Sequence, residues 1–138
     1  MNFRRVTSPL APEPAADLWS NCLVANNVVY ISGMTARSLT DPEAVSGDNE
    51  YEQTKAVLSK IKGLIEAAGG QMADIVKLTI FVTRIDQRAH VWRARKEFFS
   101  GNFPACSLVE VSSLAKPEIL IEIEAIGHLQ EVEAHVAP

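Results

Sequence analysis

Hydrophobic positions in the first half of the chain follow a helical period in one clear segment. Over 50–68, apolar residues recur three or four positions apart and form one stripe, consisting of Val57, Leu58, Ile61, Leu64, Ile65 and Ala68. Asn49, with Glu52 three positions later, is typical of a capping box, and Gly69-Gly70 supplies a left-handed stop. The pattern therefore predicts an amphipathic helix over 50–68.

Strands are predicted on both sides of this helix. The apolar segments 20–25 and 28–32 are separated by Asn26-Asn27, and asparagine tolerates the positive φ that a tight hairpin turn requires. A shorter strand is expected within 2–7. The segment 75–82 (IVKLTIFV) is rich in branched and aromatic residues, which favours a buried strand.

The second half adds one helix and two strands. A helix is expected over 86–100, and its place between the strands 75–82 and 107–111 implies a right-handed parallel crossover. Lys116-Pro117 lies between 107–111 and the last strand, 119–127, which predicts a second hairpin. Alternation along this last strand places its isoleucines on one face and Leu120, Glu122 and Glu124 on the other.

The element order β-β-β-α-β-α-β-β predicts an α+β domain, a mixed sheet with two helices on one face. Residues 1–129 are expected to form this single domain, and 130–138, which lacks periodicity, to form a flexible tail. Helices on one face leave apolar residues such as Leu108 and Leu120 uncovered on the other. A second copy of the chain would cover them, so we expect a homo-oligomer.

Composition narrows the classes of function. The 138 residues are 47% hydrophobic and 22% charged, which is typical of one globular domain. The net charge of −4 disfavours nucleic acid as a partner, because phosphate binding needs clustered Lys and Arg. Apolar runs are too short to span a bilayer, so the expectation is a cytoplasmic protein without a membrane partner.

Few sequence motifs in this chain indicate a chemical activity. Cys22 and Cys106 are far apart and belong to no C-x-x-C pair or Cys/His cluster, so no metal site is predicted and both thiols are expected to be free. The chain has no P-loop, no G-x-G-x-x-G and no nucleophile elbow, and no cofactor is predicted.

One segment is more informative than the rest. The sequence FPACSLVEV at 103–111, followed by IEIEAI at 121–126, resembles the Rid family (also called YjgF or L-PSP), whose members carry F-P-A-R-S-x-V-E-V and then I-E-I-E-A. The similarity extends over about 6–127. Its further matches are Ser32-Gly33, Glu66-Ala67-Ala68-Gly69, Asp74-Ile75-Val76-Lys77 and Phe98-Phe99.

The resemblance implies a chorismate-mutase-like fold and a homotrimer, whose sheets form a central barrel with three clefts between subunits. It also implies hydrolysis of reactive enamines and imines to keto acids and ammonia, so the expected ligand is a small organic acid or imine. In active members an arginine grips the substrate carboxylate, a glutamate orients water and an early aromatic residue closes the cleft. On this basis Glu122 is the candidate catalytic residue. The candidate substrate-binding residues are Trp19, Ser32, Gly33, Trp92, Cys106 and Leu108.

Position 106 departs from the motif, because cysteine stands where active members have arginine. The loss of a bidentate charged contact costs about 2–3 kcal/mol of binding, which disfavours the family's usual 2-imino-acid substrate. Four arginines lie around the second predicted helix, where most such side chains are solvated: Arg84, Arg88, Arg93 and Arg95. Of these, Arg93 or Arg95, close to Trp92, would be the replacement cation.

Three functions stay open at this level. The first is a deaminase-type hydrolase acting on an atypical substrate, and the second is a non-catalytic metabolite-binding or regulatory trimer. The third is an endoribonuclease or translation inhibitor, a label attached to part of the family, which the net charge disfavours. Each candidate site residue also has a purely structural interpretation. Cys106 would be a small buried hydrophobic residue, Trp19 and Trp92 would be core residues, and Glu122 would be a solvated or paired carboxylate.

Overall fold

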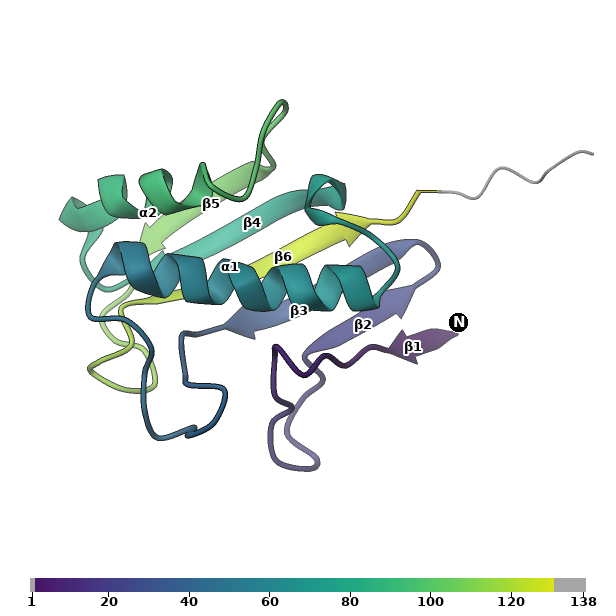
Figure 1. Cartoon of the computed structure of the whole chain (residues 1–138), viewed down its shortest axis with the longest axis horizontal. Coiled ribbons are helices and arrows are strands. Elements are labelled where there is room, and N and C mark those ends of the chain that lie inside the picture. The colour runs from purple at the N-terminus through teal and green to yellow at the C-terminus, as the bar shows by residue number, and fades with distance from the viewer. Residues whose placement is uncertain (1, 131–138) are drawn as a thin grey trace, which may run out of the picture.

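The last strand of the described residues lies in the middle of the sheet. The computed structural model describes residues 2–130, and its six-stranded sheet has the order β1-β2-β3-β6-β4-β5 (Figure 1). The strands are β1 (Phe3–Arg5), β2 (Cys22–Ala25), β3 (Val28–Met34), β4 (Ile75–Val82), β5 (Ala105–Glu110) and β6 (Ile121–His128). Neighbours pair antiparallel except β4 and β5, which are parallel as the predicted crossover requires.

Helix α1 (Glu50–Ala67) forms as the sequence predicts. The Asn49 side chain accepts a hydrogen bond from the backbone N–H of Glu52 at 2.9 Å, which caps the first turn. At the other end Gly69 has a φ of 102°, a conformation that favours glycine, and Gly70 N–H donates to the Ile65 carbonyl. The whole predicted apolar stripe of this helix is buried against the sheet.

Helix α2 (Arg88–Arg95) is shorter than the segment 86–100 predicted for it. A 3-10 turn, Ile85–Gln87, precedes it, and hydrogen-bonded turns continue after it as far as Phe99. Both helices lie on one face of the mixed sheet, which confirms the predicted α+β architecture (Figure 1).

The predicted hairpin between 107–111 and 119–127 is wrong. β5 pairs only with β4, and β6 pairs with β3 and β4. Burial explains the order, because Ile121 and Ile123 are fully buried whereas no residue of β5 is. The strand with the larger apolar face takes the central place, and the more exposed one takes the edge.

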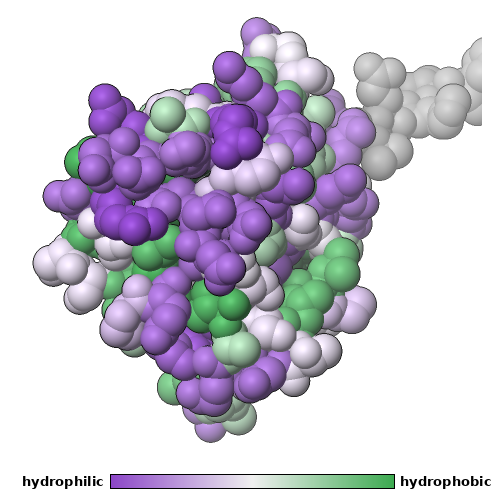
Figure 2. All heavy atoms as spheres, turned by 60° about the vertical axis from the view of Figure 1, so that its left-hand side comes forward, coloured by the Kyte–Doolittle hydropathy of each residue, from purple (hydrophilic) through white to green (hydrophobic). Residues whose placement is uncertain are grey.

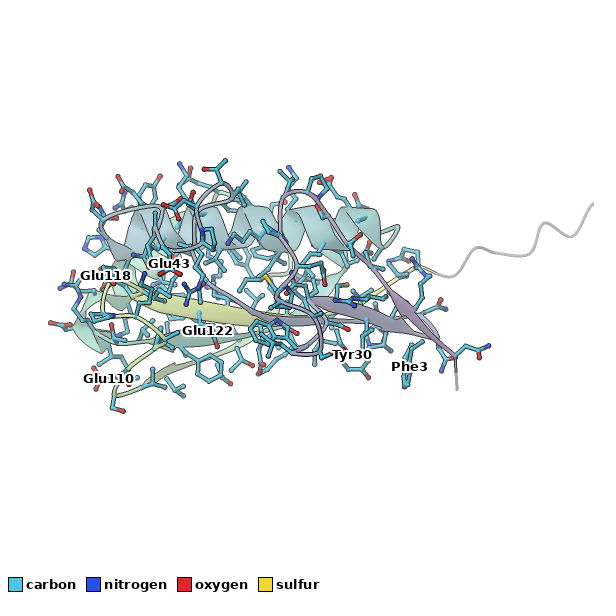
Figure 3. The ribbon with its side chains drawn as sticks, turned by 90° about the horizontal axis from the view of Figure 1, so that it is seen from below. Phe3, Tyr30, Glu43, Glu110, Glu118 and Glu122 are labelled. Carbon is cyan, nitrogen blue, oxygen red and sulfur yellow. The ribbon has the colours of Figure 1, made fainter. Side chains whose placement is uncertain are left out.

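The helices cover one face of the sheet and leave the other face exposed. Alternation turns Leu78, Ile80 and Ile123 toward the helices, where they are fully buried. On the other face Tyr30 is 49% exposed and Glu122 is half-buried, and Figure 3 shows both on the side away from α1. No segment of residues 2–130 packs over this second face, so the need for a second copy stays a prediction.

A bidentate ion pair fastens the start of α1 to the end of β4. Arg84 Nε and Nη2 donate to the two carboxylate oxygens of Glu50, each at 2.7 Å. The Glu50 side chain is 2% exposed and that of Arg84 is 51% exposed. This pair neutralises a carboxylate that would otherwise be buried alone.

Three further expectations concern the rest of the chain. Cys22 and Cys106 are both free thiols. No helix among the described residues is long and apolar enough to cross a membrane, and the side of the molecule that Figure 2 brings forward is mainly hydrophilic, with separate hydrophobic patches. The tail predicted over 130–138 lies outside the described residues except for Gln130, whose amide donates to Asp74 Oδ1.

Candidate functional site

A cavity of about 360 Å³ lies beside the start of β6. The loop 11–19, the end of β3 and the segment 34–43 contribute to its wall. Three residues singled out from the sequence line it together: Trp19, Gly33 and Glu122. Trp19 is 54% exposed, and its indole N–H donates to Asn21 Oδ1 at 3.2 Å, which fixes the ring from the side of the loop.

An irregularity in β3 brings the Glu122 carboxylate against the backbone. The pairing of β3 with β6 shifts register between Ile31 and Met34, as in a β-bulge, and such bulges re-aim side chains beside functional sites. A Cβ atom at Gly33 would lie 2.6 Å from Oε2 of Glu122, closer than any real contact. Position 33 therefore has to be glycine for the carboxylate to occupy this place.

Ser32 lies outside the cavity that holds Glu122. Its hydroxyl donates to the Ser20 carbonyl at 2.6 Å, and its backbone N–H donates to the Asn21 carbonyl. It lines a separate hollow of about 290 Å³ on the uncovered face, together with Lys77 and Glu124. In the single chain, Ser32 thus joins the loop after residue 19 to β3.

Glu122 has the electrostatic character of a base. Burial raises the pKa of its carboxyl group, and the negative charge of Glu124 raises it further. A carboxylate with a raised pKa takes a proton more readily than an ordinary glutamate. The cavity thus combines a carboxylate of raised pKa with an aromatic ring, which suits it to activating a water molecule beside a small ligand.

Lys60 is a cavity residue that sequence reasoning missed. Its ammonium donates to the carbonyls of Thr35 and Arg37, both at 2.8 Å, and burial and the charge of Arg37 lower its pKa. The only sequence signal was a lysine between the apolar positions of the α1 stripe. Two of its donors hold the loop after β3, so its first role is to support one wall of the cavity.

The other three predicted site residues lie on the opposite side of the sheet. Cys106 pairs with Leu78 and Leu108 with Ile80, so both share the helix-covered face of β5. The expectation that Leu108 lies on the uncovered face is therefore wrong. Cys106 and Leu108 are both partly buried against the core, as is Trp92 of α2. Glu122 pairs with Phe81 and faces the other way, so one chain does not bring the two groups together.

Cys106 lacks the lowered pKa of an activated nucleophile. Burial raises the pKa of its thiol, and the charge of Arg95, a side-chain hydrogen bond with Arg95 and the charge of Lys77 oppose this shift without cancelling it. A thiol whose pKa is raised holds little thiolate at neutral pH.

Arg93 and Arg95 point to different neighbours. The Arg93 guanidinium carbon lies 3.8 Å from the centre of the Tyr51 ring. That of Arg95 lies 4.5 Å from the centre of the Trp92 ring and 5.3 Å from the centre of the ring of Phe103, the first residue of the FPACSLVEV motif. Of the two, Arg95 is the one whose charge and side-chain hydrogen bond act on the Cys106 thiol.

The described residues offer no evident metal centre. Among 2–130, no group of three or more His, Cys, Asp or Glu side chains is close enough to hold a metal ion. The wall of the Glu122 cavity carries three carboxylates, one aromatic ring and two cationic side chains: Glu13, Glu43, Glu122, Trp19, Arg37 and Lys60.

Comparisons with known proteins agree with this architecture. A family model described as endoribonuclease L-PSP matches residues 9–129. A protein from Dermatophagoides farinae named 2-iminobutanoate/2-iminopropanoate deaminase is 35% identical over 123 residues, which cover 89% of this chain and 94% of that protein.

Solved structures extend the likeness to three dimensions. A Pseudomonas aeruginosa protein of unknown function is 40% identical, with a TM-score of 0.80 over 93% of both chains. A Rid-family protein of unknown function from Yersinia pestis is 31% identical, with a TM-score of 0.84 over 93% of this chain and all of that one. The fold expected from the resemblance is therefore confirmed.

Proposed function

Because this chain belongs to the endoribonuclease L-PSP family, also called the Rid family, we propose that it hydrolyses small imines or enamines to carbonyl compounds and ammonia. The observation that carries the proposal is Glu122, a carboxylate with a raised pKa held against the Gly33 backbone in a cavity. The deaminase name of the Dermatophagoides relative supports the same reaction class.

The reaction follows from the properties of Glu122. The substrate reacts as the protonated imine: the Glu122 carboxylate accepts a proton from a bound water as the water oxygen bonds to the C=N carbon and the C=N π electrons move to nitrogen. The resulting carbinolamine carries hydroxyl and amino groups on one carbon. Glu122 then gives the proton to nitrogen and the C–N bond breaks. Ammonia leaves as the carbonyl forms, and the hydroxyl proton passes to the Glu122 carboxylate and from there to ammonia or solvent. Trp19 forms part of the wall around the ligand.

The complete site is proposed to lie between copies of the chain in a homotrimer. This arrangement is supported by the uncovered face of the sheet and by the division of candidate residues between its two faces. The group formed by Trp92, Cys106 and Leu108, near the edge strand β5, would then meet the Glu122 cavity of a neighbouring copy. Light scattering after size exclusion tests the assembly, and a monomer would contradict it.

The activity is tested with freshly generated 2-iminobutanoate. The expected result is faster formation of 2-oxobutanoate and ammonia than in buffer alone, in proportion to protein concentration. No acceleration, at a concentration where an active Rid protein works, would remove this substrate. Metabolite binding without turnover would instead support a non-catalytic trimer.

Gly33→Ala should impair turnover by displacing Glu122. The added methyl group would lie 2.6 Å from Oε2, so the carboxylate has to move away from its present place. A misplacement of about 1 Å at a reacting group costs up to about 100-fold in rate. We expect kcat to fall between about 10- and 100-fold, while the melting temperature changes little because a flexible side chain absorbs the clash.

A double-mutant cycle controls this prediction. In a Glu122→Gln background, Gly33→Ala should lower the residual rate much less, because its effect passes through the carboxylate. Equal losses in both backgrounds would mean that Gly33 acts independently of Glu122.

A further inference from the structure

Lys60 is the one buried lysine among the six of the chain, all of which the structure describes. It is 8% exposed and lines the Glu122 cavity. Lysines usually keep the ammonium group in water, because burial of that charge costs much free energy unless a carboxylate offsets it. The carbonyls of the loop after β3 account for the position of the Lys60 nitrogen but do not offset its charge.

The nitrogen of Lys60 has no carboxylate partner in the described part of the chain. The ion pairs found among residues 2–130 include neither Lys60 nor Glu122. The other two carboxylates of the cavity wall have cationic partners elsewhere, in the pairs Glu13–Arg5 and Glu43–Lys116. The charged group nearest in effect to Lys60 is another cation, Arg37.

The hydrogen bonds of Lys60 suit a neutral amine as well as an ammonium group. Its Nζ donates to the carbonyls of Thr35 and Arg37, both at 2.8 Å. A neutral amine has two N–H groups and one lone pair, so loss of a proton breaks neither bond and leaves the lone pair in the third position. Burial lowers the pKa of Lys60, and the charge of Arg37 lowers it further. Desolvation and a neighbouring cation are the two conditions that make a lysine nucleophilic.

We propose that Lys60 forms a Schiff base with small aldehydes that enter the Glu122 cavity. This activity goes beyond the proposed hydrolysis and does not require it. The Nζ lone pair bonds to the carbonyl carbon, and one nitrogen proton passes to the carbonyl oxygen to give a carbinolamine. The hydroxyl then leaves with the second nitrogen proton as water, and the C=N bond forms. When protonated, this imine has one N–H group, so it keeps one of the two loop carbonyls as an acceptor.

The surroundings of Lys60 favour small aldehydes over other carbonyl compounds. The cavity volume of about 360 Å³ is at the lower end of the range for small-molecule sites. The two loop carbonyls lie directly against the nitrogen, and this crowding disfavours a ketone, which has two carbon substituents where an aldehyde has one. The wall has apolar side chains that suit a short aliphatic group: Ala11, Pro12, Pro14, Ala15, Leu18 and Met34.

The test traps the Schiff base by reduction. The full-length chain is exposed briefly at neutral pH to propanal and sodium cyanoborohydride, which converts the imine to a stable propyl amine, and peptide mass mapping locates the label. We expect Lys60 to be labelled about 10-fold faster than Lys62, an exposed lysine of the same helix, because an exposed amine is almost fully protonated at this pH. Equal or slower labelling of Lys60 overturns the proposal.

Two controls assign the label to the folded cavity. Lys60→Arg keeps N–H donors for the loop carbonyls but stays protonated, so it should lose the fast label, whereas Lys62→Arg should retain it. Circular dichroism checks that both variants are folded. In the parent chain unfolded by urea, Lys60 and Lys62 should be labelled at equal rates. A rate advantage of Lys60 that persists in urea would attribute its reactivity to the local sequence and overturn the role of the cavity.

The outcomes separate this proposal from the hydrolase function. Selective labelling of Lys60 in a protein that releases no ammonia from 2-iminobutanoate sustains the Schiff base and refutes the hydrolase. Ammonia release by a protein whose Lys60 is not labelled selectively sustains the hydrolase and refutes the Schiff base.

Discussion

Glu122→Gln should lower kcat for imine hydrolysis by about 10²- to 10⁴-fold, the usual contribution of a positioned general base. Glutamine keeps the size of the side chain in the cavity beside Gly33 but does not accept the proton of the attacking water. The measurement is the rate of ammonia release from 2-iminobutanoate. Turnover within a few-fold of the parent would remove Glu122 from the catalytic role.

The same variant should be more stable than the parent at neutral pH. Burial raises the pKa of Glu122 in the folded state, so ionisation of this group opposes folding at pH values above that pKa. The folded protein therefore regains stability as the pH falls through the raised pKa toward that of the unfolded chain. Melting temperatures of the two proteins should differ most at neutral pH and converge in acid.

Glu124→Gln is the matched control for both effects. Removing the like charge of Glu124 lowers the pKa of Glu122, so the acid limb of the pH–rate profile should move to lower pH while turnover at neutral pH is retained. If Glu124→Gln abolished turnover as Glu122→Gln does, the assignment of the base would be wrong.

The largest expected effect on stability comes from Arg84→Met. This change leaves the Glu50 carboxylate, whose side chain is 2% exposed, without its bidentate partner. Breaking a buried pair from one side costs about 3–5 kcal/mol, and the exposure of Arg84 places the expected loss near the lower value, about 3 kcal/mol. Urea unfolding at one fixed protein concentration measures it, since assembly would add a concentration dependence.

Two further variants make the Arg84 prediction specific. Arg88→Met removes an exposed arginine that bonds only the Ile85 carbonyl, and it should change stability by less than about 0.5 kcal/mol. Glu50→Gln combined with Arg84→Met should recover part of the loss, because it removes the buried charge. A loss as small for Arg84→Met as for Arg88→Met would mean that water solvates Glu50 adequately.

Local signals in the sequence predicted most of the secondary structure but not the order of the strands. The cap at Asn49, the α1 stripe and the β4–β5 crossover are determined by neighbouring residues or by chirality. Whether β6 pairs with β5 or inserts between β3 and β4 depends on which strand can be buried on both edges. That competition involves the whole chain, so turn residues at Lys116-Pro117 were an unreliable guide.

The candidate site, too, was only partly predictable from the sequence. The motif resemblance selected Gly33 and Glu122, which the structure places in direct proximity. It did not reveal that Cys106 faces the other side of the sheet, because the register between β4 and β5 is set across a long connection. The buried Nε of Arg95, which has no hydrogen-bond partner among the described residues, was equally hidden, because hydrogen bonding of a buried group depends on the tertiary structure.

The central position of β6 also governs how the chain is assembled during synthesis. β6 pairs with both β3 and β4. The part of the sheet formed by β1, β2 and β3 and the part formed by β4 and β5 therefore cannot join until β6, the last of the six strands, has been synthesised. Pairings between distant segments form slowly, and unpaired strand edges are prone to aggregate in the interval. Because Glu122 lies on this strand, the carboxylate proposed as the base arrives in the same step that joins the two parts of the sheet. A nascent chain lacking β6 therefore leaves one edge of β3 and one edge of β4 unpaired and lacks this carboxylate.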